Sequence, residues 1–133
     1  MTDAHVLYAD GASRGNPGAA AIGAVLYGPD GEVVARVSEA IGQATNNVAE
    51  YRAVIAGLEA ALGLGVERLR VRLDSLLLVR QIRGEYRVKA PGLQPLYRRV
   101  RALMDRFSSF SVEHVRRELN SVADGLANAA LDA

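Results

Sequence analysis

The spacing of hydrophobic residues predicts three strands at the start of the chain. Side chains alternate between two faces over 5–10, which is typical of a strand that ends at Asp10. A turn-rich segment covers 11–18, and a run of small and β-branched residues over 19–27 indicates a second strand. A Pro-Asp-Gly hairpin turn then precedes a third strand over 32–41. We therefore expect three consecutive antiparallel strands.

After the third strand the apolar residues recur at steps of three and four, which predicts amphipathic helices. Thr45 or Asn46 can cap the first helix, and Gly63 or Gly65 can end it. A second helical stripe follows a Pro-Gly break. The two stripes consist of Val48, Tyr51, Ile55, Leu58 and Leu62, and of Leu93, Leu96, Val100, Leu103 and Phe107.

The remaining segments complete an α/β fold. We expect strands over 68–74 and 109–115, a short helix over 76–83 and a last, alanine-rich helix over 121–131. The order β-β-β-α-β-α-α-β-α predicts one five-stranded mixed sheet with helices on its faces and right-handed crossovers. The length of 133 residues suits a single domain over 1–133.

The composition excludes several kinds of site and indicates where the protein is located. The chain has no cysteine, which excludes disulfides, thiolate metal sites and a cysteine nucleophile. No apolar run is long enough for a signal peptide or for the ~20 residues of a membrane span. We therefore expect a soluble, cytoplasmic protein without a membrane partner.

The net charge of +1 conceals an uneven distribution along the chain. Acids outnumber basic residues between Asp10 and Glu50, whereas basic residues dominate between Arg80 and Arg101, with Glu85 as the lone acid. Such a basic run is either a solvated helix surface or, beside a metal site, part of a groove for a polyanion. The seven basic residues of the second segment are Arg80, Arg83, Arg87, Lys89, Arg98, Arg99 and Arg101.

Four acids stand at positions where this fold would bring them together. Asp10 and Asp74 end the first and fourth strands, which would share an edge if the strands are parallel neighbours. Glu50 lies early in the first long helix, and Asp124 lies early in the last helix, between Val122 and Leu126, which look buried. Oxygen ligands alone favour Mg²⁺ or Mn²⁺. Alternatively, the four acids have structural roles only, as helix caps, turn formers and charges that interact favourably with helix dipoles.

Four local motifs resemble type 1 ribonucleases H. The segment 10–18, Asp-Gly-Ala-Ser-Arg-Gly-Asn-Pro-Gly, is similar to the family's DGS-x-x-GNPG opening, and 45–50 resembles its TNN-x-AE segment. Leu73-Asp-Ser matches the strand-end DS, and 120–127 matches the final N-x-x-AD-x-LA. Because the motifs occur in the family's order and span most of the chain, they form a specific signal.

The resemblance implies an activity and a site. It implies an endonuclease that hydrolyses the RNA strand of RNA–DNA hybrids with two Mg²⁺ or Mn²⁺ ions, giving 5′-phosphate and 3′-hydroxyl ends. Asp10, which would bridge both ions, is joined as a ligand by Glu50, Asp74 and Asp124. The predicted hybrid-binding residues are Asn16, Thr45, Asn46, Asn47, Ser75, Arg80, Arg83 and Arg87. We also expect a monomer.

The chain departs from the best-known family pattern in two places. The short segment 84–90 stands where many members carry a basic, tryptophan-containing protrusion, and this chain has no Trp. The loop before the last motif is short, so Arg117 is the match for a mobile-loop histidine and is predicted to serve the reaction. His114 falls within a strand pattern, which favours a packed or edge histidine over a catalytic one.

Two other functions fit parts of the pattern. A hybrid- or RNA-binding module could use this fold without cutting, although an inactive relative would be expected to lose a carboxylate and this chain keeps all four. An exonuclease or integrase of the wider superfamily would also use acids, but the GNPG and TNN segments suit hybrid recognition better.

Overall fold

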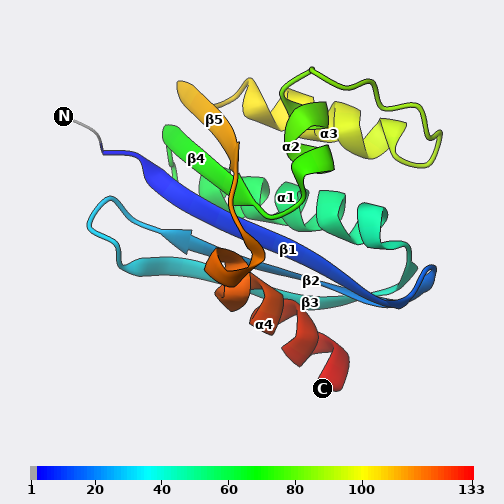
Figure 1. The fold of residues 1–133 in the computed structure, drawn as a ribbon. Coiled ribbons are helices and arrows are strands. Elements are labelled where there is room, and N and C mark those ends of the chain that lie inside the picture. The colour runs from blue at the N-terminus through cyan, green and yellow to red at the C-terminus, as the bar shows by residue number, and fades with distance from the viewer. Residues whose placement is uncertain (1–2) are drawn as a thin grey trace.

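The computed structural model describes residues 3–133, and its elements follow the expected order (Figure 1). A short 3₁₀ helix, η1, is an addition that the sequence pattern did not indicate. The elements are β1 (His5–Gly15), β2 (Gly18–Tyr27), β3 (Val33–Ala44), α1 (Asn46–Gly63), β4 (Arg68–Leu73), α2 (Leu76–Ile82), α3 (Gln94–Met104), β5 (Ser109–His114), η1 (Arg117–Asn120) and α4 (Ser121–Asp132).

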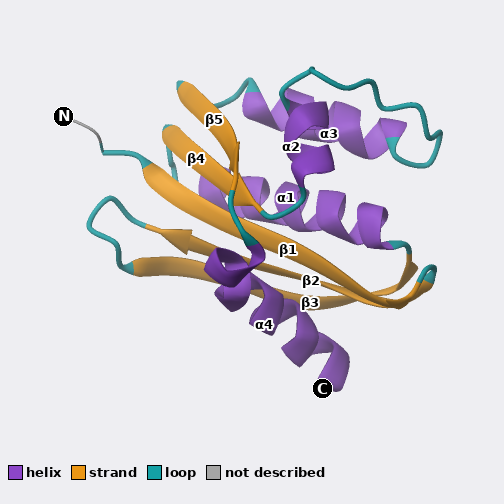
Figure 2. Cartoon of the chain, in the orientation of Figure 1, coloured by secondary structure: helices purple, strands orange, loops and turns teal. Residues whose placement is uncertain are grey.

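The five strands form one mixed sheet in the order β3-β2-β1-β4-β5. β1 pairs antiparallel with β2 and parallel with β4, and β5 continues the parallel half. α1 covers one face of the sheet with α3 packed against it, while α4 lies on the opposite face (Figure 2). The predicted fold class, with helices on both faces, is confirmed.

The first strand is longer than the sequence pattern indicated. β1 does not end at Asp10; it remains paired with β2 as far as Gly15↔Gly18. Only 16–17 turn, and Gly15 takes a positive φ of 120° there, which suits a residue without a Cβ. The pairing with β4, by contrast, stops at Tyr8↔Arg72. Asp10 therefore follows the parallel pairing although it is still inside the strand.

α1 is buried on more of its circumference than the predicted stripe. Tyr51 and Leu58 are fully buried, as expected, but so are Ala53 and Val54, whereas Ile55 is only partly buried. The helix lies between the sheet and α3, so a single narrow stripe cannot describe its contacts.

The expected burial of Val122 in the last helix is wrong. Val122 is 49% exposed, and Ala123 and Ala127 are the buried residues of α4. Gly23 of β2 explains the choice, because a Cβ there would lie 2.1 Å from the carbonyl oxygen of Ala123. The small residues thus let the helix backbone approach the sheet closely.

Among residues 3–133, no helix has both the length and the apolar character needed to cross a bilayer.

Candidate active site

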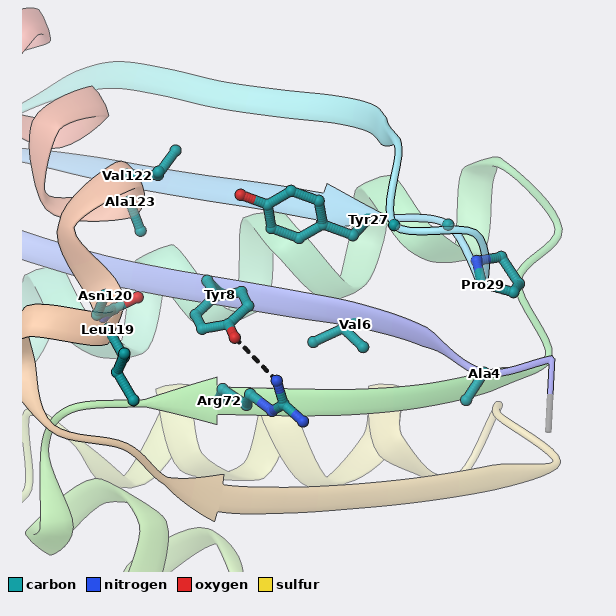
Figure 3. Close-up of a pocket in the computed structure, with 12 residues that line it drawn as sticks. Ala4, Val6, Tyr8, Tyr27, Pro29, Arg72, Leu119, Asn120, Val122 and Ala123 are labelled. Atoms are coloured by element: carbon teal, nitrogen blue, oxygen red, sulfur yellow. Dashed lines mark hydrogen bonds between the residues drawn. The ribbon is translucent and has the colours of Figure 1, made fainter.

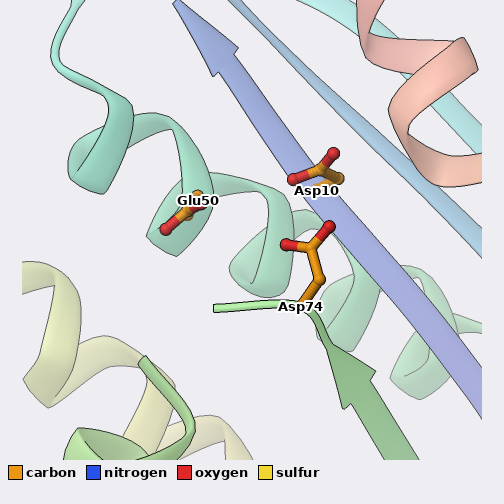
Figure 4. Close-up of side chains that lie close together, drawn as sticks. All are labelled: Asp10, Glu50 and Asp74. Carbon is orange, nitrogen blue, oxygen red and sulfur yellow. The ribbon is translucent and has the colours of Figure 1, made fainter. Parts of the chain in front are cut away.

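Three of the four predicted acids meet at one edge of the sheet. Asp10 of β1, Glu50 of α1 and Asp74, directly after β4, each offer a carboxylate oxygen, and these oxygens all lie within 4.8 Å of one another (Figure 4). These residues come from three elements far apart in the sequence. The predicted convergence of Asp10, Glu50 and Asp74 is therefore present in the structure.

The strand register explains how Asp10 and Asp74 come together. Because Tyr8 pairs with Arg72, each aspartate lies two residues beyond the end of the same parallel pairing. Gly11 allows α1 to approach β1 closely, since a Cβ at Gly11 would lie 2.4 Å from the backbone nitrogen of Glu50. The glycine after Asp10 thus allows the first turns of α1 to pack on β1.

Asp124 lies beside Asp10 from the opposite side. Its carboxylate lies close enough to Asp10 to raise the pKa of that side chain, and the Nδ2 of Asn128 donates to the Oδ1 of Asp124 at 3.2 Å. At the start of the helix, the Nδ2 of Asn120 donates to the carbonyl oxygen of Ala9 at 3.0 Å. Asn128 was not among the predicted site residues, although its i+4 spacing from Asp124 on a helix was a usable signal.

Crowding of the carboxylates changes their acidity. Burial, the charge of Asp74, and hydrogen bonding and charge from Asp124 raise the pKa of Asp10 to about 8. Burial and Asp74 raise the pKa of Glu50 to about 7, against smaller opposing effects from Ser75 and Arg117. Near neutral pH both acids are therefore partly protonated, and a cation placed between them would displace these protons.

The donor set fits a hard divalent cation. Each of the grouped ligand atoms is a carboxylate oxygen, which Mg²⁺ and Mn²⁺ prefer. Within residues 3–133, no other group of three or more such side chains meets this geometry.

The predicted hybrid-binding residues of the first half line a shared groove. Asn16, Thr45, Asn46 and Asn47 border a space of about 470 Å³ whose other wall includes Leu93. The Oδ1 of Asn16 accepts a hydrogen bond from the backbone nitrogen of Asn46 at 3.3 Å. Thr45 caps α1, as expected, through its Oγ1 and the backbone nitrogen of Val48 at 3.3 Å. The structure brings the four residues together, and their contact with a hybrid stays a prediction.

Ser75 and Arg117 lie next to the acid cluster. Ser75 caps α2 through a hydrogen bond from the backbone nitrogen of Leu78 at 3.3 Å, and its side chain acts to lower the pKa of Glu50. Arg117 is exposed in η1, and its charge lowers the pKa of Glu50. His114 is exposed at the end of β5, with its Nε2 3.2 Å from the carbonyl oxygen of Asp74. It is therefore an edge residue and not a packed one.

The basic residues after Asp74 do not form a uniform free surface. Arg83 donates from Nε to the carbonyl oxygen of Val112 at 2.9 Å, so part of its role is to join α2 to β5. Arg80 packs over the Tyr86 ring and donates to its hydroxyl at 3.1 Å. Arg87 lies on the rim of a wide groove beside Tyr86 and Arg98.

Comparison with known proteins places the chain in a family. A family model described as reverse transcriptase-like matches residues 8–130. Ribonuclease HI of Halobacterium salinarum is 49% identical over 125 residues, which cover 94% of this chain and 63% of that protein. The chain likewise spans only 35% of a bifunctional protein of Mycobacterium tuberculosis that is 50% identical over 129 residues.

Solved structures agree with this placement. The N-terminal RNase H domain of the mycobacterial protein has a TM-score of 0.93 and 49% identity, and the match covers 96% of this chain and 98% of that one. An RNase H1 in complex with an RNA/DNA hybrid has a TM-score of 0.91 and 41% identity, with 96% of each chain covered. Given the acid cluster, the fold and these matches, the chain belongs to the type 1 ribonucleases H.

Proposed function

We propose that the protein is an endonuclease that hydrolyses the RNA strand of RNA–DNA hybrids with the help of two Mg²⁺ or Mn²⁺ ions. The observation that carries the proposal is that carboxylate oxygens of Asp10, Glu50 and Asp74 lie within 4.8 Å of one another, with Asp124 close enough to raise the pKa of Asp10. The family relationship supports it, because one relative is named ribonuclease HI and another was solved with a hybrid.

The four carboxylates would hold the ions. Asp10 lies among the other three acids, so its carboxylate would be the ligand shared between the ions. When bound, such a pair of ions activates a water molecule and stabilises the oxygen that leaves the phosphodiester. The water oxygen joins phosphorus as the bond to the 3′-oxygen breaks, which leaves 5′-phosphate and 3′-hydroxyl ends.

The groove beside the first turn of α1 would recognise the hybrid. Asn16, Asn46 and Asn47 carry both donors and acceptors, so their amides can bond a 2′-hydroxyl without reading base sequence. Thr45 and Ser75 would approach backbone atoms from their positions at two helix N-termini.

Basic side chains would bind phosphate on either side of the acid cluster. Arg117 acts near Glu50, where a permanent positive charge can hold a phosphate but cannot shuttle a proton. Arg80, Arg83 and Arg87 would contribute phosphate contacts farther along the hybrid.

Labelled substrate provides the decisive test. The protein should cleave the RNA strand of a labelled RNA–DNA hybrid when Mg²⁺ or Mn²⁺ is present. EDTA should stop this cleavage. A non-catalytic binding module would retain the hybrid without cutting it under any of these conditions, and cleavage restricted to strand ends would point to an exonuclease. The cytoplasmic location and monomeric state expected from the sequence stay predictions.

A further inference from the structure

A second pocket lies on the face of the sheet opposite α1, between the β2–β3 hairpin and the η1–α4 junction. It encloses about 400 Å³, within the range of small-molecule sites. Its floor is formed by β1 and β4, and its walls by the β2–β3 hairpin and the η1–α4 junction (Figure 3). It shares no lining residue with the cavity around Asp10, Glu50 and Asp74.

Aromatic rings and apolar side chains make up most of the lining. Tyr8 and Tyr27 meet edge to face, with ring centroids 5.8 Å apart and an interplanar angle of 88°. Leu119 and Val122 stand at the rim and are 58% and 49% exposed, although side chains of this kind are usually buried. A flat, partly apolar ligand would cover these surfaces.

Polar atoms without hydrogen-bond partners indicate that the ligand carries polar groups along its edge. Asn120 is 1% exposed, yet its Oδ1 has no hydrogen-bond partner among the described residues, and Figure 3 shows this oxygen directed toward Tyr8. The Tyr27 hydroxyl points across the pocket and has no hydrogen bond within residues 3–133. The Asn120 oxygen is covered by its neighbours, so the Tyr27 hydroxyl is the group that a ligand can reach, and a purely apolar occupant would leave this hydroxyl unpaired.

Arg72 adds hydrogen-bond donors but little net charge. Its Nε donates to Glu113 at 2.6 Å and its Nη1 donates to the Tyr8 hydroxyl at 2.8 Å. Glu113 balances the positive charge, so an anion alone is not the expected ligand. A guanidinium has five N–H groups, and the others remain for an acceptor on a planar partner.

We propose that this pocket binds a nucleobase, as part of a nucleoside or of an unpaired strand end. A base is uncharged and planar, has donors and acceptors along its edge, and stacks on aromatic side chains. Its edge can accept from the free N–H groups of Arg72, while its face covers the ring of Tyr27. The assignment does not depend on the activity proposed for the acid cluster.

Titration of the full chain with adenosine and with a short single-stranded oligonucleotide tests the proposal. EDTA is present so that phosphates cannot be bridged to the carboxylates by metal. Adenosine should bind saturably, with a dissociation constant between about 10 µM and 1 mM for a ligand of this size. Tighter binding of the oligonucleotide that Val122→Arg reduces would identify a strand end as the source of the base, and equal or weaker binding than adenosine would identify a free nucleoside.

Variants locate the bound base. Tyr27→Leu removes the ring and hydroxyl and should weaken binding about tenfold, the effect of losing one stacking partner. Val122→Arg at the exposed rim should obstruct the pocket and serves if Tyr27→Leu lowers stability too far. Tyr86→Leu is the matched control, because Tyr86 is a 47% exposed tyrosine in the basic region. Absence of saturable adenosine binding, or loss of binding in Tyr86→Leu but not in Tyr27→Leu or Val122→Arg, would overturn the proposal.

Discussion

Gly23 of β2 and Ala123 of α4 touch so closely that no Cβ fits between them. A Cβ at Gly23 would lie 2.1 Å from the Ala123 carbonyl oxygen and 2.6 Å from the backbone nitrogen of Ala127. The neighbouring residue, Asp124, helps to raise the pKa of Asp10 in the acid cluster. The packing of α4 on the sheet therefore sets the position of one member of the candidate metal site.

Gly23→Ala should accordingly lower both stability and activity. Backbone atoms cannot yield as a flexible side chain can, so α4 must shift, at a cost of about 1–3 kcal/mol in the free energy of unfolding. Denaturant unfolding and cleavage rate measure the two effects. Gly125→Ala in the same helix is the control, because nothing lies within 4 Å of its added methyl group. Equal behaviour of the two variants would show that the close contact does not position Asp124.

Asp10→Asn should abolish cleavage and leave the fold intact. The variant keeps the size of the side chain but loses the anionic oxygen that two cations would share. Turnover with Mg²⁺ or Mn²⁺ is the measurement, and circular dichroism checks the fold. Cleavage by Asp10→Asn at the wild-type rate would remove Asp10 from the site.

The same variant should change how stability depends on pH. Asp10 has a pKa of about 8 in the folded chain against 3.8 as a free side chain, and Glu50 has about 7 against 4.5. The folded protein thus holds these protons more tightly than the unfolded chain, so the stability of the metal-free protein falls as pH rises from about 4 to 8. Asn cannot ionise, so Asp10→Asn does not lose the part of the stability that the wild type loses when Asp10 ionises.

Melting temperatures in EDTA at pH 5 and pH 8 test this expectation. The advantage of Asp10→Asn over wild type should grow with pH and reach roughly 5 °C at pH 8 for a domain of this size. Adding Mg²⁺ or Mn²⁺ should stabilise the wild type more than the variant. An advantage that stays constant with pH would contradict the raised pKa of Asp10.

The sequence predicted the element order and the acid cluster because both depend on strong local signals. Changes of hydrophobic period marked nearly every element, and Asp74 stands next to a strand end where α/β sheets place ligand sites. The length of β1 was missed because Gly, Asn and Pro between Asp10 and Gly18 suggest turns, whereas antiparallel pairing with β2 keeps most of that segment extended. Pairing with a distant partner decided the outcome over local propensity.

Other features depend on contacts that no local pattern contains. Val122 looked buried by its chemistry, but the close approach of Gly23 to Ala123 turns it toward solvent. Arg83 looked like the other arginines in its run, and only the tertiary structure places the Val112 carbonyl within reach of it.

This difference among the arginines changes the expected effect of removing them. Arg87→Ala should raise KM, lower the salt slope of hybrid binding by about one unit and leave kcat almost unchanged, because it would lose a phosphate contact only. Arg83→Ala should in addition lower stability by about 1 kcal/mol, since it loses its hydrogen bond to Val112. Binding measured across salt concentrations, with unfolding curves, separates the two effects. An unchanged salt slope in both variants would make this surface a solvated face and not a binding site.

Arg117 and His114 offer a direct test of which side chain serves the reaction. Arg117 acts on Glu50 electrostatically, whereas the Nε2 of His114 lies 3.2 Å from the backbone carbonyl oxygen of Asp74. Arg117→Ala should slow turnover by roughly one to three orders of magnitude, the range for losing one positioned charge near a transferring phosphate. His114→Ala should cost stability more than rate.

The pH dependence adds an independent criterion for the same pair. A guanidinium does not titrate in the usable range, so with saturating metal the rate should show no limb near ~6.5, where a histidine acting as general acid would produce one. Single-turnover and steady-state assays of both variants separate chemistry from product release. If His114→Ala removes the chemical step and the pH limb while Arg117→Ala keeps the wild-type rate, the histidine at the end of β5 is the functional residue and the assignment of Arg117 is wrong.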